Sequence, residues 1–136
     1  MLLRYKPKGN GVGKFNQLTI EQYKELLDYA QEKRVGLGFD SCSAPLYLEA
    51  IKDDEDFKTK SLYAEPCESS LFSSYINCKG EFYACSFCEG EGMWQRGLDV
   101  LNCEDFYKDI WNNEKTIKFR NALLDNCRNC PMFNLC

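Results

Sequence analysis

Nine cysteines and no histidine are the feature that most constrains this chain of 136 residues. Two of the cysteines form a Cys127-x-x-Cys130 pair near the end, and two single cysteines, Cys67 and Cys85, lie far upstream. A Cys-x-x-Cys turn lets two thiolates reach one metal centre, and two more thiolates complete a tetrahedral zinc site or a four-iron cubane. The pattern predicts an all-thiolate centre, with an iron–sulfur cluster and a structural zinc as the competing interpretations.

The cysteines also indicate the cellular setting. Their number is odd and no signal peptide is recognisable, which argues against a secreted disulfide framework. In a reducing compartment this density of thiols favours metal ligation, so we expect a cytoplasmic protein. Individual cysteines such as Cys42 and Cys103 fit an inert, packed role.

Charge and hydropathy exclude two classes of partner. The chain has 17 basic and 21 acidic residues and a net charge of -4, which provides no basic face for nucleic acid. Apolar residues make up 44% of the chain, enough for a packed core. No apolar run approaches the roughly 20 residues that cross a bilayer. We therefore expect neither nucleic acid nor a membrane as a partner.

The clearest predicted helix begins at Thr19. Thr19 and Gln22 have the spacing of a capping box, in which each side chain satisfies an orphan backbone donor. An apolar stripe follows at helical spacing. Lys33 and Arg34 are expected in the last turn, where they complement the helix dipole.

This helix lies between two short apolar runs, residues 2–5 and 35–39, which we expect to be strands. Strand, helix and strand form a β-α-β unit, which implies parallel pairing. One such unit cannot cover both faces of a parallel sheet. Residues 1–60 are therefore expected to be the last part of a larger (β/α) barrel, or to pair with another chain.

A short helix is expected to end at Ile51, and the acidic run at 52–60 predicts a solvated turn or linker. We place the domain boundary there, with a second module at 61–136. In that module, residues 73–77 and 81–85 predict a β-hairpin whose turn uses Gly80. This hairpin would bring Cys85 beside the segment that follows Cys67.

Two helices are predicted after the hairpin, with Asn102 and Asn113 as N-caps. Their apolar stripes are expected to be core. The stripes consist of Phe106, Tyr107, Ile110 and Trp111, then Ile117, Phe119, Leu123 and Leu124. The whole chain is predicted to be α+β: a remnant β-α-β unit followed by a hairpin and two helices that carry a cysteine-ligated centre.

From Cys67 onward the chain resembles the C-terminal module of radical S-adenosylmethionine enzymes, in its SPASM form or its shorter twitch form. Two halves and a bridge carry the resemblance. The first half is Cys67-x12-Gly80-x4-Cys85, and the second half is Cys127-x2-Cys130-x5-Cys136. The bridge between them contains Ile110-Trp111-Asn112 and Phe119-Arg120. The full SPASM pattern continues with further cysteines, so the resemblance favours the one-cluster twitch form.

The resemblance implies a [4Fe–4S] cluster that relays an electron or helps to seat a peptide or small-molecule substrate. Its implied ligands are Cys67, Cys85, Cys127 and Cys130. The main alternate ligand is Cys136, and Cys78 and Cys88 are weaker alternates.

The family's S-adenosylmethionine-binding motif, Cys-x3-Cys-x2-Cys, does not occur in this sequence. The resemblance therefore implies part of an enzyme that does not cleave S-adenosylmethionine by itself. Its expected partner is an N-terminal radical S-adenosylmethionine half, or another chain that covers the incomplete sheet. The alternatives are a non-catalytic binding module stabilised by a zinc ion on four cysteines and a thiol-redox protein. A nucleophilic cysteine is poorly supported without a histidine base.

Overall fold

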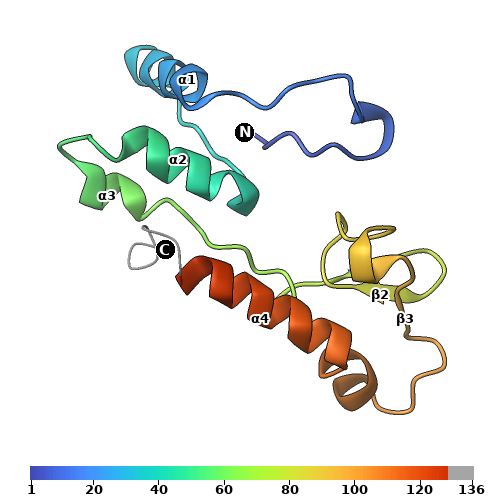
Figure 1. Ribbon diagram of the computed structural model, residues 1–136. Helices are drawn as coiled ribbons and strands as arrows, with labels where there is room; N and C mark the ends of the chain where they lie inside the picture. Colours follow the sequence, from blue (N-terminus) through green and yellow to red (C-terminus); the bar gives the residue numbers. More distant parts are fainter. Residues whose placement is uncertain (129–136) are drawn as a thin grey trace. The chain divides into compact units, whose positions relative to one another are not determined.

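The computed structural model describes residues 1–128, which form two compact units, residues 1–67 and 68–128 (Figure 1). Each unit has its own hydrophobic cluster. Several helices and one small antiparallel sheet give the predicted α+β class. Within residues 1–128, none of the helices has the length and apolar character needed to cross a membrane.

Helix α1 (Ile20–Glu32) follows the short 3-10 turn η1 (Gly9–Gly11) and begins with the predicted capping box. The N–H of Gln22 donates to Thr19 Oγ1 at 3.2 Å, and the N–H of Thr19 donates to Gln22 Oε1 at 3.0 Å. Both donors would otherwise lack an intrahelical partner, so the local sequence is sufficient to start the helix here.

The end of α1 differs from the prediction. Lys33 is the C-cap and Arg34 lies outside the helix with a φ of 54°. The N–H of Val35 then reaches the Ala30 carbonyl at 2.9 Å, which satisfies a helix-terminal acceptor. The prediction that this basic pair forms the last helical turn was wrong, because the left-handed residue ends the helix first.

The two runs predicted as strands meet at a single parallel bridge between Leu2 and Phe39. The N–H of Leu2 donates to the Gly38 carbonyl at 2.6 Å, and the N–H of Asp40 donates to the Leu2 carbonyl at 3.3 Å. The parallel direction is as predicted, but residues 1–67 contain no strand longer than this bridge. Parallel strands are typical of larger sheets whose two faces are both covered, and residues 1–67 supply no further strand beside this bridge. The barrel remnant stays a prediction.

Two further helices complete the first unit. A 3-10 turn, η2 (Ser41–Ser43), leads into α2 (Ala44–Ile51), the short helix that was predicted. Helix α3 (Phe57–Ser61) lies in the stretch predicted to be a solvated turn or linker. That prediction was wrong for α3, because Phe57 packs against the core and Ser61 is buried.

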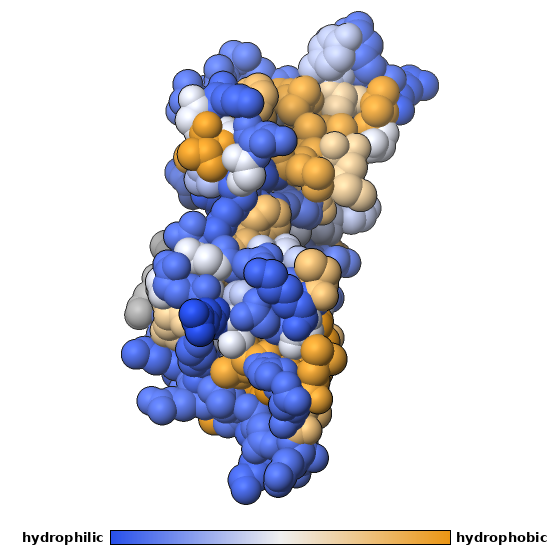
Figure 2. Space-filling view, turned by 90° about the vertical axis from the view of Figure 1, so that its right-hand side faces the viewer, coloured by the Kyte–Doolittle hydropathy of each residue, from blue (hydrophilic) through white to orange (hydrophobic). Residues whose placement is uncertain are grey.

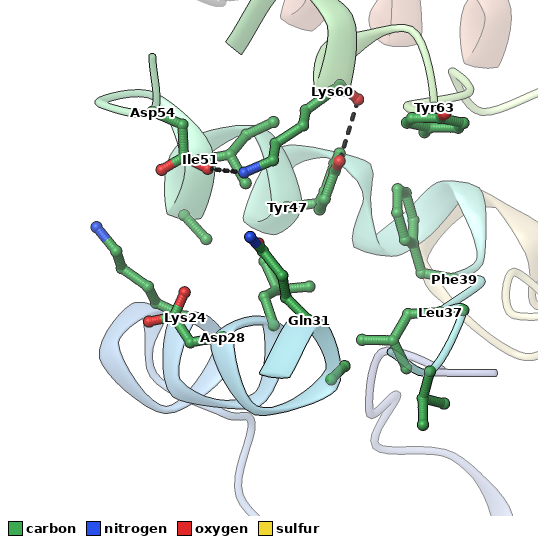
Figure 3. Close-up of a pocket in the computed structure, with 15 residues that line it drawn as sticks. Lys24, Asp28, Gln31, Leu37, Phe39, Tyr47, Ile51, Asp54, Lys60 and Tyr63 are labelled. Atoms are coloured by element: carbon green, nitrogen blue, oxygen red, sulfur yellow. Dashed lines mark hydrogen bonds and ion pairs between the residues drawn. The ribbon is translucent and has the colours of Figure 1, made fainter. Parts of the chain in front are cut away.

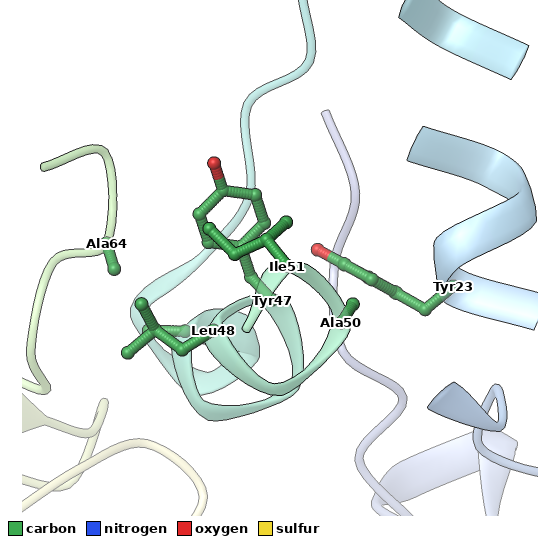
Figure 4. Packing of buried hydrophobic residues seen from close by; sticks show 7 residues of the cluster. Tyr23, Tyr47, Leu48, Ala50, Ile51 and Ala64 are labelled. Carbon is green, nitrogen blue, oxygen red and sulfur yellow. The ribbon is translucent and has the colours of Figure 1, made fainter. Parts of the chain in front are cut away.

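The first core lies between α1, α2 and the segment after α3 (Figure 4). Leu48 on α2 is fully buried, and Tyr47 donates its hydroxyl to the Lys60 carbonyl at 3.0 Å, which ties α2 to α3. The buried cluster consists of Tyr23, Ala44, Tyr47, Leu48, Ala50, Ile51 and Ala64.

The second unit contains a three-stranded antiparallel sheet in the order β1-β2-β3. The strands are β1 (Tyr75–Ile76), β2 (Glu81–Tyr83) and β3 (Leu98–Asp99). The predicted hairpin is confirmed: β1 pairs with β2, and Gly80 in its turn has a φ of 76°. Strand β3 was not predicted, since two residues are too short to show a period.

The first predicted helix of this unit is a short π-helical segment, η4 (Phe106–Trp111), preceded by a 3-10 turn, η3 (Gly92–Trp94). Its N-cap is Asp105, whose carboxylate accepts from the N–H of Lys108 at 3.0 Å. The prediction of Asn102 as the cap was wrong. Asn102 donates instead to the Asp99 carboxylate at 2.7 Å and holds the loop after β3.

Helix α4 (Glu114–Arg128) begins after Asn113. Asn113 Oδ1 accepts from the N–H of Lys115 at 3.0 Å, which agrees with the predicted cap.

The second core is built around Phe82, which is fully buried. Its ring centroid lies 6.3 Å from that of Trp94, 6.1 Å from that of Phe106 and 6.4 Å from that of Trp111. Ile110 is buried as predicted. Other members of the predicted stripes are not core: Tyr107 is 69% exposed and Ile117 is 40% exposed.

Candidate metal centre

The structure describes only part of the predicted ligand set. Cys67 is half-buried at the end of the first unit, and Cys85 is half-buried after β2 in the second. Cys127 belongs to α4, while Cys130 and Cys136 lie outside the described residues. Among the side chains that the structure describes, which do not include that of Cys127, no three of cysteine, aspartate or glutamate come together as a metal site. The ligand set therefore stays a prediction.

Cys85 is held in place by the buried strand that precedes it. Tyr83 and Ala84 are buried and carry the chain to Cys85. The buried hydroxyl of Ser70 donates to the Ala84 carbonyl at 3.5 Å. The segment after Cys67 therefore docks beside Cys85, as the hairpin predicted.

The sulfur of Cys85 is surrounded by hydrogen-bond donors. The N–H of Phe87 donates to it at 3.5 Å. The side chains of Cys88, Ser69 and Ser86 act in the same direction on its pKa, which they lower. The hydrogen bond from Cys88 contributes most to lowering the pKa of Cys85 to about 5, while burial acts in the opposite direction. Cys85 is therefore a thiolate at neutral pH, the form that binds metals. This chemistry fits a thiolate-ligated centre.

The other described cysteines have different surroundings. Cys78 is exposed in the hairpin turn. Cys103 donates its thiol to the Val100 carbonyl at 3.3 Å and packs against the second core, which agrees with an inert role. Cys42 is half-buried in the first unit, where its backbone carbonyl accepts a hydrogen bond from Arg4 at 3.1 Å.

The bridge between the cysteine halves locks η4 to the start of α4. Arg120 donates to the Trp111 carbonyl at 2.7 Å and to Asn112 Oδ1 at 3.2 Å, and its guanidinium carbon lies 5.3 Å from the centre of the Trp111 ring. The buried Thr116 hydroxyl donates to the Ile110 carbonyl at 2.9 Å. These contacts give the Ile-Trp-Asn and Phe-Arg sequences a structural role: they anchor the helix that carries Cys127.

A pocket of about 380 Å³ in the first unit was not predicted (Figure 3). Phe39 and Tyr47 line the pocket, and the centroids of their rings lie 4.4 Å apart. Lys60 and Asp54 also line it, and Lys60 Nζ lies 2.6 Å from the Asp54 carboxylate. The hydrogen bond to Asp54 is the main cause of a raised pKa of Lys60, which therefore stays cationic. Sequence reasoning missed the pocket because its lining comes from α1, α2, α3 and the segments between and after them, which only the folded chain brings together. None of the cysteines that the structure describes lines it, so it is separate from the chemistry at Cys85.

The second unit is thus a small α+β module whose best-placed reactive group is a thiolate. Residues 67–131 match the family model SPASM, described as an iron–sulfur cluster-binding domain, over just under half of the chain. This part of the chain is a SPASM domain, as the resemblance implied, and iron–sulfur cluster binding is its assigned property. No curated protein and no solved structure matched the chain.

Proposed function

We propose that this chain is the C-terminal, auxiliary-cluster portion of a radical S-adenosylmethionine enzyme. The observation that carries the proposal is the SPASM match over residues 67–131. In this proposal a [4Fe–4S] cluster is held by Cys67, Cys85, Cys127 and Cys130, with Cys136 as the main alternate ligand. The thiolate character of Cys85 supports ligation at that position.

The proposed role is electron transfer or structural support for substrate positioning. A cluster with four thiolate ligands supplies one-electron chemistry and has no open coordination position for a substrate. The N–H of Phe87, which donates to Cys85 Sγ, is the kind of hydrogen bond that tunes a cluster potential. The protein's part is then to hold the ligands and to shield them, which the buried residues Phe82 and Tyr83 favour.

Cleavage of S-adenosylmethionine is proposed to need a second component. This sequence lacks Cys-x3-Cys-x2-Cys, and its first unit has a single parallel bridge. Leu3 is 68% exposed and Val35 is 57% exposed, and both lie near that bridge in the sequence. Figure 2 shows one face of the molecule, on which hydrophobic residues lie among hydrophilic ones. We propose that an N-terminal radical S-adenosylmethionine half, or another chain, adds strands here. A peptide or small-molecule substrate would belong to the completed enzyme.

The test is an anaerobic preparation of the full chain with iron and sulfide counts, absorbance near 400 nm and EPR of the reduced protein. Near four irons per chain, with a band that bleaches on reduction, supports the proposal. Cys130→Ala is expected to lose most of the iron, because ligation energy is folding energy in small metal modules. Full iron content and an unchanged thermal midpoint in this variant would contradict the ligand assignment.

A zinc site formed by four cysteines is the second candidate, and one observation favours it. The N–H of Cys88 donates to the Cys85 carbonyl at 2.9 Å, so the two cysteines share one tight turn. Two thiolates bound at about 2.3 Å to one tetrahedral ion lie roughly 3.8 Å apart, a spacing that such a pair can reach. One zinc and no sulfide after strictly anaerobic isolation would select this alternative over the cluster.

A further inference from the structure

The first unit contains a pocket of about 380 Å³ whose lining includes none of the described cysteines. All of the lining residues lie between positions 24 and 63, so the pocket belongs to this unit alone. Small-molecule sites are concave, have volumes of roughly 300–1,000 Å³ and combine an apolar wall with a few polar groups. The pocket has the size of such a site, and the chemistry of its lining indicates what it can hold.

Part of the lining is apolar and aromatic. The rings of Phe39 and Tyr47 have centroids 4.4 Å apart, and Leu27 and Ile51 belong to the same lining. Tyr47 is buried and is fixed by its hydroxyl, which donates to the Lys60 carbonyl at 3.0 Å. An apolar group of a ligand would therefore leave water for a rigid apolar surface, which favours binding.

The charged groups that reach the pocket from α3 and from the turn before it are already paired. Lys60 Nζ lies 2.6 Å from the Asp54 carboxylate and 3.0 Å from the Asp56 carboxylate. A ligand anion would have to displace one of these carboxylates from the ammonium group. Lys60 is therefore a poor partner for a ligand.

The charged groups that α1 contributes from the other side of the pocket are Lys24 and Asp28 (Figure 3). They are four residues apart, which places them on neighbouring turns of the same helix face. Within the part of the chain that the structure describes, neither side chain forms a hydrogen bond or an ion pair. A ligand can engage one cation and one carboxylate here without breaking an existing bond.

We propose that the pocket binds a free α-amino acid with an apolar side chain. Asp28 binds its ammonium group, Lys24 binds its carboxylate, and its side chain lies against Phe39 and Tyr47. Charge complementarity selects this class, because a zwitterion gives both free groups a partner, whereas an amine or a carboxylic acid leaves one of them without. The inference requires no metal centre and is independent of the proposed cluster.

The experiment is titration calorimetry of the full chain with amino acids and with analogues that lack one group. L-Phenylalanine or L-leucine is expected to bind saturably, with one molecule per chain. Phenethylamine lacks the carboxylate and hydrocinnamate lacks the ammonium group, so each should bind about fivefold more weakly than phenylalanine, the upper range for an exposed ion pair. Glycine lacks the apolar side chain and should not bind measurably.

Variants on α1 then assign the two ends of the ligand. Asp28→Asn should weaken binding of phenylalanine and phenethylamine by about fivefold and leave hydrocinnamate unchanged. Lys24→Gln should weaken phenylalanine and hydrocinnamate by about fivefold and leave phenethylamine unchanged. Glu25→Gln is the matched control, since Glu25 is on α1 but does not line the pocket. Lys24 and Asp28 are exposed, so the thermal midpoint should stay in place.

Three results would overturn the inference. One is the absence of saturable binding by both phenylalanine and leucine. Another is an affinity for phenethylamine or hydrocinnamate equal to that for phenylalanine. The third is an equal loss of phenylalanine binding in Glu25→Gln and Asp28→Asn. Iron and sulfide are counted on the same preparation, so failure of the cluster assignment is recognised separately from failure at this pocket.

Discussion

The protonation state of Cys85 depends mainly on the side chain of Cys88. The Cys88 hydrogen bond is the first cause of the lowered pKa of Cys85, followed in effect by the opposing burial and by the N–H of Phe87. The thiolate therefore depends on a residue three positions away in the turn, rather than on a distant cation.

The first prediction concerns this dependence. In metal-free protein, the rate of Cys85 alkylation by iodoacetamide should follow a titration centred at about pH 5. Cys88→Ala removes the main donor, so the midpoint should move up towards the ordinary thiol value of about 8.5. Rates measured by mass spectrometry from about pH 4 to 9 test this, a range that spans both values. Cys78→Ala is the control and should leave the midpoint in place; an unmoved midpoint in Cys88→Ala would refute the assigned cause.

The second prediction concerns stability and follows from the lowered pKa of Cys85. The folded pKa of Cys85, about 5, lies below the unfolded value of about 8.5, so the unfolded chain binds more protons in that window. The stabilisation of the folded state by this thiolate is complete above about pH 8.5. It is lost as the pH falls through about 5. Urea unfolding of metal-free protein should show a stability slope in this range that Cys85→Ala lacks. Equal slopes in both proteins would contradict it.

At the scale of the elements, the hairpin depends on the side chain of Asn77. Its Oδ1 accepts from the N–H groups of Lys79 and Glu81, each at 3.0 Å. Its Nδ2 donates to Glu81 Oε2 at 2.9 Å and to Glu89 Oε1 at 2.8 Å. One buried amide thus joins the β1–β2 turn to the segment after Cys88.

The third prediction follows from these bonds. Asn77→Ala should lower the free energy of unfolding by about 1–3 kcal/mol, because buried donors and acceptors lose their partner. Asn77→Asp keeps an acceptor but places a carboxylate beside Glu81 and Glu89, so its loss of stability should shrink at acid pH. Denaturant unfolding at about pH 4.5, near the ordinary carboxyl pKa, and at about pH 7.5 measures both. If Asn77→Asp were equally destabilising at both pH values, charge repulsion would not be the reason.

The β2–β3 pairing depends on a close approach at Gly97. A Cβ at this position would lie 2.6 Å from Glu81 Cβ and 2.7 Å from the Phe82 carbonyl oxygen. The second of these contacts is backbone in the middle of β2, so it cannot move without disturbing the sheet.

The fourth prediction is that Gly97→Ala costs about 1–3 kcal/mol of stability, as expected for overpacking. Gly36→Ala is the matched control, because a Cβ there meets nothing within 4 Å. The control should differ little from the unaltered protein in its urea midpoint. Equal midpoints for the two variants would mean that the sheet accommodates the methyl group.

At the scale of the whole molecule, each unit has a core of its own. The first surrounds Leu48 and the second surrounds Phe82. The metal ligation proposed at Cys85 should therefore stabilise the second unit more than the first, because the free energy of metal binding adds to the folding free energy of the unit that holds the ligand.

The fifth prediction tests this selectivity. Removing the metal from anaerobically isolated protein with a chelator should lower hydrogen-exchange protection in β2 and α4 by at least about tenfold. Protection in α1 should stay within about twofold, because its bonds depend on the first core. Hydrogen exchange followed by mass spectrometry measures both units at once. A parallel loss of protection in α1 would indicate that the two cores unfold together.

The sequence by itself determined the features that depend on near neighbours. The capping box at Thr19, the end of α2 at Ile51 and the hairpin around Gly80 were all predicted, because each depends on contacts within a few residues. The cysteine spacing likewise identified the SPASM domain, since the pattern is carried by residue types and intervals.

The tertiary structure decided what depends on distant or crowded contacts. Cys88 was a weak alternate in the sequence, yet a tight turn bonds its N–H to the Cys85 carbonyl. Phe57 lies against the first core because α3 packs there. Asn102 donates a hydrogen bond to Asp99 and does not cap a helix as predicted. Local propensity cannot rank such partners, because their energies depend on which groups the folded chain brings together in space.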